Sequence, residues 1–399
     1  MARMSWAKLD DYREVASRGA VDVLLHIGER LRGRRIVHVS ASRYAGAGVE
    51  VLNRLVPIMN DLGIETSWEV TIGGADFDTI ARSVGKALDG TEQVITEGML
   101  ERLRAVLGDN ARRLRLDADL VTVHDAGPLL LVESRGSSGR WVWRHHGDVS
   151  TAQTLLWSAI RPAVQRYDAA VFSLPRFAAP LSIPRFVIYP SIDPLSERNR
   201  EMPRSEQSLV LERLHVARDK PILLQVGPFE RDGDPLGVVN AYRLVKKHHD
   251  VRLVLAGPPP AAGDVLADVQ EAAARDPDLV VVTLPPDPQT ELNALERAAT
   301  AVIHKPLETD FGIDVAAAMW KGKPVIGSAV GGIPFQIAQG LTGYVVETVE
   351  GAAFRIRYLL NNPELIGRMG AAGREQVRRH FLVTRHLASD LALLAHLTR

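Results

Sequence analysis

The chain has no cysteine among its 399 residues, which excludes a disulfide framework, a thiolate metal site and a cysteine nucleophile. It also has no net charge, because 48 Lys and Arg balance 48 Asp and Glu, so no basic surface for nucleic acid is indicated. No apolar run approaches the roughly 18 residues of a membrane-spanning helix, and the polar Met1–Asp11 is unlike a secretory signal. We therefore expect a cytoplasmic protein that binds neither nucleic acid nor membrane.

Short apolar runs alternate with stretches of helical spacing along the whole chain. Arg35–Ser40 and Ala118–His124 in the first half, and Pro221–Val226 and Val251–Ala256 in the second, are predicted to be buried strands. Such alternation is typical of an α/β protein whose parallel sheet is covered by helices on both faces. The polar, proline-bearing segment Pro190–Ser205 interrupts the pattern and is the best candidate for a linker.

This break predicts two doubly wound, Rossmann-like domains over residues 1–195 and 205–380, with a C-terminal helix over 381–399 that crosses back to the first domain. Ligands bind outside the carboxyl ends of the strands in such folds, so we expect a cleft between the domains. On these grounds alone, a dehydrogenase, a two-domain epimerase or a binding protein of the periplasmic type fits equally well.

Longer stretches narrow the choice of family. Five of them resemble retaining family 4 glycosyltransferases, and most of all the branch of trehalose synthases that join a nucleotide-activated glucose to glucose: Trp143–Asp148, Tyr167–Ser173, Ser191–Ser196, Glu291–Ala298 and Met319–Gly327. The resemblance covers about residues 35 to 395. It implies the GT-B architecture, with the acceptor bound by the N-terminal domain and the nucleotide sugar by the C-terminal domain.

Polar residues at one predicted strand end are the candidates for catalysis. They are Arg144, His146 and Asp148, and in the enzymes they resemble the histidine lies against the donor sugar. Imidazole can donate or accept a hydrogen bond and can carry a proton near neutral pH, although a lone histidine is more often structural. His145 should point the other way, because side chains alternate along a strand.

The small-residue loop after the first strand is a second candidate. The resemblance places a glycine pair at Gly46 and Ala47, near the donor phosphates and the acceptor, although position 47 is alanine here, and Gly48 is a further donor-binding candidate. Small residues allow a ligand to approach the backbone closely, and the N–H groups at a helix start favour anions. A tight strand–helix turn is the alternative. Glu50 and Trp143 are the predicted acceptor-binding residues.

The donor side departs from the family pattern at four positions. The family has an arginine and a lysine in the loop after the first strand of the second domain, and two glutamates around a Phe-Gly pair. The matching residues here are Pro228, Gly233, Thr309 and Ala317. Transfer from a nucleotide sugar develops negative charge on the leaving diphosphate and needs fixed cations or donors there. The losses therefore predict a changed donor, a changed chemistry or no catalysis.

The remaining candidates for donor binding lie close to these four positions. They are Arg231, Asp310, Gly312, Ile313, Asp314 and Val315. Arg231 is either a replacement cation or a solvated loop residue. Asp310 and Asp314 are able to bind hydroxyl groups or to cap the following helix, and we favour capping for at least one of them.

Our leading hypothesis is a glycosyltransferase of specialised, natural-product metabolism that moves a sugar from a nucleotide-activated donor to an unusual small-molecule acceptor, such as a thiol. Trehalose synthesis from nucleoside diphosphate glucose and glucose is one alternative. A catalytically inactive sugar-binding or regulatory relative is the other. We expect no cofactor and no metal site, and the sequence leaves a homodimer open.

Overall fold

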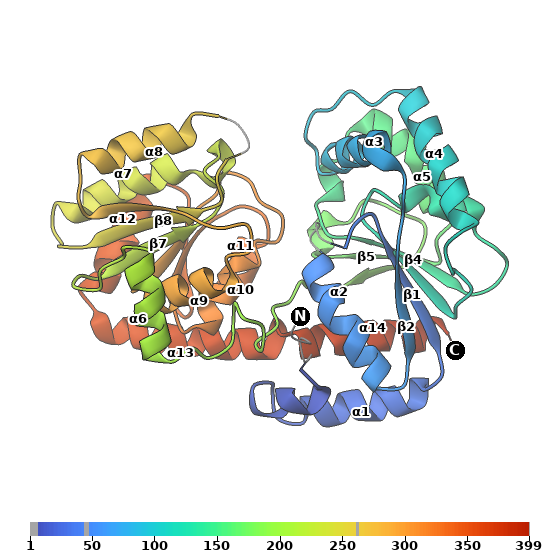
Figure 1. Cartoon of the computed structure of the whole chain (residues 1–399), viewed down its shortest axis with the longest axis horizontal. Coiled ribbons are helices and arrows are strands. Elements are labelled where there is room, and N and C mark those ends of the chain that lie inside the picture. The colour runs from blue at the N-terminus through green and yellow to red at the C-terminus, as the bar shows by residue number, and fades with distance from the viewer. Residues whose placement is uncertain (1–6, 44–47, 261–262, 399) are drawn as a thin grey trace. The chain divides into compact units, whose positions relative to one another are not determined.

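The computed structural model describes residues 7–43, 48–260 and 263–398. Its contacts divide the chain into two compact units, which are Met1–Ser191 with Val383–Arg399, and Ile192–Leu382 (Figure 1). The domains expected from the sequence span residues 1–195 and 205–380, with a C-terminal helix over 381–399. The last helix, α14 (Val383–Leu397), belongs to the first unit although it follows the second unit in the chain.

The first unit contains a parallel six-stranded sheet in the order β2-β1-β3-β4-β5-β6. Its strands are short runs of mostly apolar residues, and β3 and β5 are buried along their whole length, as a parallel sheet covered on both faces requires. The strands are β1 (Arg35–Ser40), β2 (Glu65–Val70), β3 (Leu120–His124), β4 (Arg140–His145), β5 (Ala169–Phe172) and β6 (Arg185–Val187).

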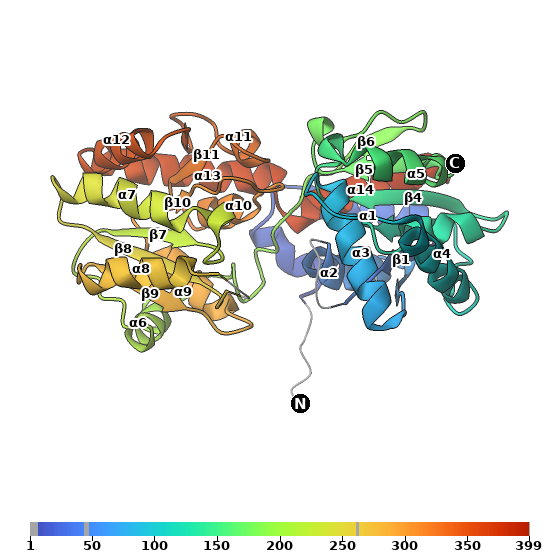
Figure 2. The same cartoon turned by 90° about the horizontal axis from the view of Figure 1, so that it is seen from above.

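Two groups of helices pack on the two faces of this sheet (Figure 1), and Figure 2 looks down on the face that the first group covers. One face, with the apolar core that includes Trp141 and Trp143, meets α3 (Gly74–Leu88), α4 (Glu97–Ala111) and α5 (Thr154–Val164). The other face meets α2 (Val49–Asp61) and α14, and α1 (Ala20–Leu31) packs against α14. The short 3-10 helices are η1 (Leu9–Glu14), η2 (Leu129–Ser134), η3 (Val149–Thr151) and η4 (Pro175–Phe177).

The second unit contains another parallel six-stranded sheet, in the order β12-β11-β10-β7-β8-β9. Two parallel sheets in one chain confirm the predicted α/β fold class with two doubly wound halves. The strands are β7 (Ile222–Val226), β8 (Arg252–Gly257), β9 (Leu279–Thr283), β10 (Ala301–His304), β11 (Val325–Ser328) and β12 (Gly343–Val346).

A capping side chain marks the start of α7 in the second unit. Asp234 caps α7 by accepting from the backbone N–H of Gly237 at 3.1 Å, and Pro235 occupies the first helical position. The helices are α6 (Arg204–Arg213), α7 (Pro235–Lys246), α8 (Val265–Ala274), α9 (Gln289–Ala298), α10 (Asp314–Trp320), α11 (Ile333–Gln336), α12 (Val349–Leu360) and α13 (Pro363–His380), with η5 (Arg231–Gly233) before α7.

Each sheet has one point at which the strand order reverses. In the first unit it lies between β1 and β3, and in the second between β7 and β10. The connections on either side of such a point run in opposite directions and leave a crevice at the carboxyl ends of the strands, where ligands bind. In each unit, these strand ends are therefore the expected location of a site.

Candidate active site

Three histidines of the first unit lie side by side, on or just after the neighbouring strands β1, β3 and β4. His38 in β1, His124 at the end of β3 and His146 just after β4 are all buried. The Nδ1 atom of His38 lies 3.0 Å from Nε2 of His124, and Nδ1 of His124 lies 3.5 Å from Nε2 of His146. The predicted catalytic residue His146 is thus one end of a continuous chain of imidazoles, which we call the histidine chain.

The surroundings keep the histidine chain neutral. Burial lowers the pKa of His146 to about 4, although the Asp125 carboxylate opposes the shift. Burial, together with the Arg144 guanidinium, lowers the pKa of His38 to about 3, and burial holds the pKa of His124 well below its usual value. At neutral pH each ring therefore has one N–H donor and one acceptor nitrogen.

Gly48 lies against the outer end of the histidine chain. Its backbone is at φ −86° and ψ −14°, a conformation open to any residue. A Cβ atom at this position would lie only 2.8 Å from Nε2 of His146. Close packing, not backbone conformation, therefore requires glycine here. The predicted donor residues Gly46 and Ala47 lie outside the described residues, and Glu50 is exposed in the first turn of α2.

Arg144 has a different environment from the predicted one. Its buried guanidinium contacts Asp390 at 3.0 Å and Nε2 of His386 at 2.7 Å, both on α14. Strand alternation places Arg144 on the face that α14 covers, so it binds the last helix to the sheet instead of meeting a ligand. The structure corrects the predicted catalytic role of Arg144 to a structural one.

The other candidates around β4 also have defined partners. Trp143 is fully buried, packs edge-on against Phe172 and donates from Nε1 to the carbonyl of Asp125 at 3.1 Å, which contradicts its predicted contact with an acceptor. His145 lies on the same face as Trp143, and its Nε2 lies 2.9 Å from the Asp89 carboxylate. Half-buried Asp148 caps η3 by accepting from the N–H of Ser150 at 2.9 Å.

The Arg144–Asp390 pair predicts a large stability effect. Asp390→Ala should lower the free energy of unfolding by roughly 3 to 5 kcal/mol, because it leaves a buried guanidinium without its carboxylate. Replacing both partners, as Arg144→Met with Asp390→Leu, should recover most of that loss. Urea denaturation measures both, and Glu271→Ala in the exposed Arg275–Glu271 pair is the control, with an expected effect below about 1 kcal/mol. Equal effects in Asp390→Ala and the control would contradict the assignment.

The second unit places a buried cation at its switch point. Lys305 directly follows β10, and its Nζ lies 2.6 Å from Oδ2 of Asp234, the residue that caps α7. Beside it, Gln225 of β7 donates from Nε2 to the carbonyl of Gly233 at 2.7 Å. The Oε1 atom of Gln225 is buried and has no hydrogen-bond partner among the residues that the structure describes.

The four altered donor positions lie in the segments that follow the switch-point strands β7 and β10. Pro228 and Gly233 lie in the loop after β7, and Thr309 and Ala317 flank the start of α10. Ala317 is buried in the helix, whereas Thr309 is half-buried. Arg231 is exposed at the start of η5, and its guanidinium makes no hydrogen bond or ion pair within the described part of the chain, as expected for a solvated arginine that an anion can reach.

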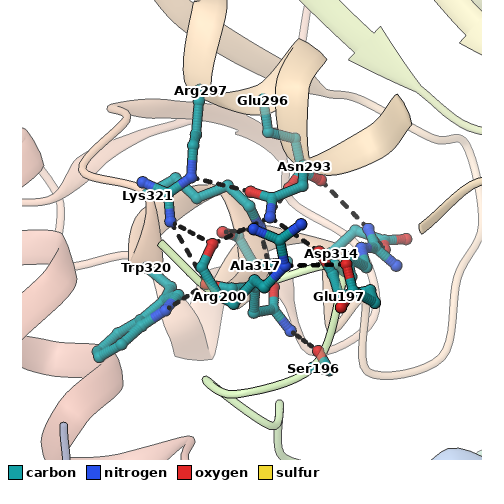
Figure 3. A network of polar contacts seen from close by, with 12 residues as sticks. Ser196, Glu197, Arg200, Asn293, Glu296, Arg297, Asp314, Ala317, Trp320 and Lys321 are labelled. Atoms are coloured by element: carbon teal, nitrogen blue, oxygen red, sulfur yellow. Dashed lines mark hydrogen bonds and ion pairs between the residues drawn. The ribbon is translucent and has the colours of Figure 1, made fainter. Parts of the chain in front are cut away.

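Half-buried Asp314 belongs to a network of charged groups whose other members are largely buried (Figure 3). Its Oδ1 lies 2.6 Å from Arg198, which also contacts Glu296 at 3.2 Å. Glu296 in turn lies 2.6 Å from the ammonium group of Lys321, which also donates to Asn199 at 2.8 Å. Burial raises the pKa of Asp314, but the positive charges of Arg198, His304 and Lys321 together outweigh it and the net shift is downward. The Asp314 carboxylate is therefore ionised and held by Arg198.

The loop before α10 presents little side-chain chemistry. Gly312 adopts φ +68°, a left-handed conformation that favours glycine, and its carbonyl accepts from Gln336 at 2.9 Å. Ile313 is the N-cap residue and Val315 is fully buried, so Val315 is not available to a ligand through its side chain. The N-cap residue Ile313 makes no side-chain cap, and Asp314 stands in the first turn of α10, where its carboxylate is paired with Arg198. Asp310 is exposed, and the prediction that at least one of the two aspartates caps the helix stays a prediction.

Neither a metal cluster nor a membrane span is found in the described residues. In residues 7–43, 48–260 and 263–398, no group of three or more histidine, aspartate or glutamate side chains is placed to hold a metal ion. No helix in the same ranges is both long and apolar enough to cross a membrane.

Comparisons with known proteins agree with this architecture. Residues 38–179 match the family model of the trehalose synthase N-terminal domain, and residues 211–376 match that of group 1 glycosyl transferases. Among solved structures, the trehalose-6-phosphate synthase OtsA has a TM-score of 0.70 at 13% identity, covering 92% of this chain and 99% of its own. A glycosyltransferase from Rickettsia africae also has a TM-score of 0.70, at 15% identity, with 91% and 98% covered. These findings define a glycosyltransferase of GT-B architecture.

Curated relatives specify the branch. The trehalose synthase of Pyrococcus horikoshii is 37% identical over 397 residues, which cover 97% of this chain and 96% of that protein. The trehalose synthase of Rubrobacter xylanophilus is 35% identical over 407 residues, with 98% and 97% covered. The chain belongs to the trehalose synthase branch of the GT-B glycosyltransferases, as its sequence motifs predict.

Several polar residues of these sites were not predicted from sequence. They are His38, His124, His386 and Asp390 in the first unit, and Lys305, Gln225, Arg198, Glu296 and Lys321 in the second. His124 and Lys305 had a usable signal, because each stands at the carboxyl end of a predicted strand. The others stand within apolar runs or in distant segments, and only the fold brings them together.

Proposed function

We propose that the chain makes trehalose by transferring a glucosyl group from a nucleoside diphosphate glucose to glucose. The observation that supports this most is the 37% identity to a trehalose synthase over 97% of the chain. Trehalose synthesis is better supported than our leading hypothesis of an unusual donor or a thiol acceptor, because the full-length relatives are trehalose synthases.

The proposed reaction exchanges one bond at the anomeric carbon for another. The bond to the diphosphate oxygen breaks as the bond to a glucose hydroxyl oxygen forms on the same face, so the configuration is retained. The hydroxyl proton passes to the leaving diphosphate. Nothing in this step requires a cofactor, and the two substrates are small molecules.

Residues of both units have parts in this proposal. His146, neutral at pH 7, hydrogen-bonds the donor sugar from the end of the histidine chain. Lys305 and Arg231 supply the positive charge that remains near the β7–β10 switch point for the diphosphate. Because Lys305 is already paired with Asp234 and Arg231 is exposed, we expect turnover to be slow.

A second function is favoured by one specific observation. The four charged donor positions of the family are replaced together, by Pro228, Gly233, Thr309 and Ala317. A chain that no longer needs to stabilise a leaving diphosphate would lose these charges at no cost. The second candidate is therefore a catalytically inactive relative that binds a sugar or regulates a partner.

One assay separates the two candidates. Incubation with glucose and UDP-, ADP- or GDP-glucose should give trehalose and the matching nucleoside diphosphate, and His146→Ala should abolish the product without changing the circular dichroism spectrum. In parallel, a nucleoside diphosphate that binds should raise the melting temperature by mass action. Stabilisation by a free sugar with no trehalose formed would support the second candidate. No trehalose and no stabilisation by any nucleotide would overturn the first.

A further inference from the structure

His38 is the innermost member of the histidine chain. It is buried in the middle of β1, whose sequence is RIVHVS, and its neighbours along the strand are Val37 and Val39. Its Nδ1 contacts His124, while its Nε2 is buried without a hydrogen-bond partner in the described residues. Burying a polar group without a partner costs free energy. A leucine at this position would avoid that cost, so the imidazole calls for another explanation.

The tautomers of the three rings in the histidine chain depend on one another. Each neutral ring has one N–H, and each contact between rings needs one donor and one acceptor. Only two arrangements satisfy both contacts. In one, every ring donates outward and the proton of His146 is on Nδ1. In the other, every ring donates inward and His146 has a bare Nδ1 atom.

The charges at the two ends favour the outward arrangement. At the inner end, His38 lines a cavity of about 20 Å³ together with Arg144 and Asp390, and Arg144 is the charge that lowers the pKa of His38. A guanidinium favours a bare nitrogen over an N–H there. At the outer end, the Asp125 carboxylate accepts from the backbone N–H of His146 at 3.1 Å and opposes the lowering of that ring's pKa by burial. A carboxylate favours an N–H over a bare nitrogen at this end of the histidine chain.

The outer nitrogen of His146 is the one left for a ligand. Its Nε2 lies beside His124 and Gly48, where even a Cβ atom would come within 2.8 Å. Its Nδ1 makes no hydrogen bond to any residue that the structure describes. The proton on this atom decides whether His146 donates a hydrogen bond to a ligand or accepts one.

We propose that His38 and His124 are positioning residues that hold His146 in the tautomer with its proton on Nδ1, so that His146 presents an N–H donor to the ligand. The catalytic role of this N–H group, to form a hydrogen bond with an oxygen of the donor sugar, rests on the proposed function. The tautomer itself does not, because it follows from contacts within the first unit.

Nitrogen NMR on the full chain labelled with 15N-histidine measures the tautomer directly, without substrate. Wild-type His146 at neutral pH should show a protonated Nδ1 and a bare Nε2, and its resonances are identified by their loss in His146→Gln. His38→Leu removes the inner ring and should give a mixture of His146 tautomers. His38→Asn, whose side-chain amide can still donate to His124, should restore the single wild-type tautomer. His26→Asn on the exposed face of α1 is the control and should change nothing at His146.

Gly48→Ala tests the same coupling from the other end and remains informative if His38→Leu does not fold. Position 48 has an ordinary φ, so the new methyl group acts only by separating His146 from His124. The His146 tautomers should mix as in His38→Leu. A His146 spectrum unchanged in both variants, or a bare Nδ1 in the wild type, would overturn the proposal. Absence of trehalose in the assay above would contradict the proposed function and leave this result untouched.

Discussion

Restoring the four family charges should raise the rate of transfer from nucleoside diphosphate glucose by at least roughly a hundredfold to a thousandfold, the contribution of a single donor. Each fixed donor to a developing anion contributes about 3 to 4 kcal/mol to transition-state stabilisation. The variant carries Pro228→Arg, Gly233→Lys, Thr309→Glu and Ala317→Glu. Steady-state kinetics with UDP-, ADP- and GDP-glucose measure the rate, and calorimetry measures nucleotide affinity, which should also rise.

The structure shows which of these substitutions fit and which need room. A Cβ atom at Gly233 would lie 2.8 Å from the carbonyl of Pro228, and Ala317 is buried inside α10. Pro228→Arg with Thr309→Glu avoids both difficulties and is the companion variant. Pro258→Arg, in an exposed position after β8, controls for added charge alone. Micromolar binding of UDP-glucose and rapid trehalose formation by the wild type would show that the lost charges are not needed.

Acidification should destabilise the first unit strongly between pH 6.5 and about 4. Burial lowers the pKa of folded His38 to about 3 and that of folded His146 to about 4, whereas unfolded histidine titrates near 6.5. Above pH 6.5 both states are neutral and the full stability is present. Below pH 6.5 these histidines bind protons in the unfolded chain but not in the folded chain. The free energy of unfolding therefore falls by about 1.4 kcal/mol per pH unit for each histidine. The two histidines together give nearly 3 kcal/mol per pH unit.

Urea denaturation at pH 7, 6 and 5 measures this slope. Tryptophan fluorescence reports mainly on the first unit, which contains Trp68, Trp141, Trp143 and Trp157. His38→Leu should remove one histidine's share of the slope, and the exposed-histidine variant His26→Asn should not change it. A slope that is the same in wild type and in His38→Leu would mean that His38 is protonated in the folded state, against the neutral histidine chain.

The fold was predictable because its signal is local. Strands of a parallel sheet buried on both faces are continuous apolar runs, and such runs mark β1, β3, β7 and β8 directly in the sequence. The alternation of side chains along a strand likewise predicts that His145 and His146 point to opposite sides of the sheet. The family followed from motifs that lie within these same segments.

Residues of the candidate site were predicted only where they closely follow a predicted strand. His146 and Gly48 were found in this way, and the structure brings them together. Arg144 was misassigned because its partner Asp390 is 246 positions away in the chain, and no local pattern indicates that a distant helix covers that face of the sheet. Lys305 follows a predicted strand, but its ion pair with Asp234, 71 positions earlier in the chain, has no local signal.

The place of α14 in the first unit has a consequence for synthesis on the ribosome. Residues 192–382 must be made before this helix exists, which takes about 10 to 40 s at roughly 5 to 20 residues per second. During that interval the nascent first unit has its sheet but neither Asp390 nor His386 to contact Arg144. The second unit, although translated later, has its whole sequence available first. Vectorial folding of this chain therefore completes its units in the reverse of their order of synthesis.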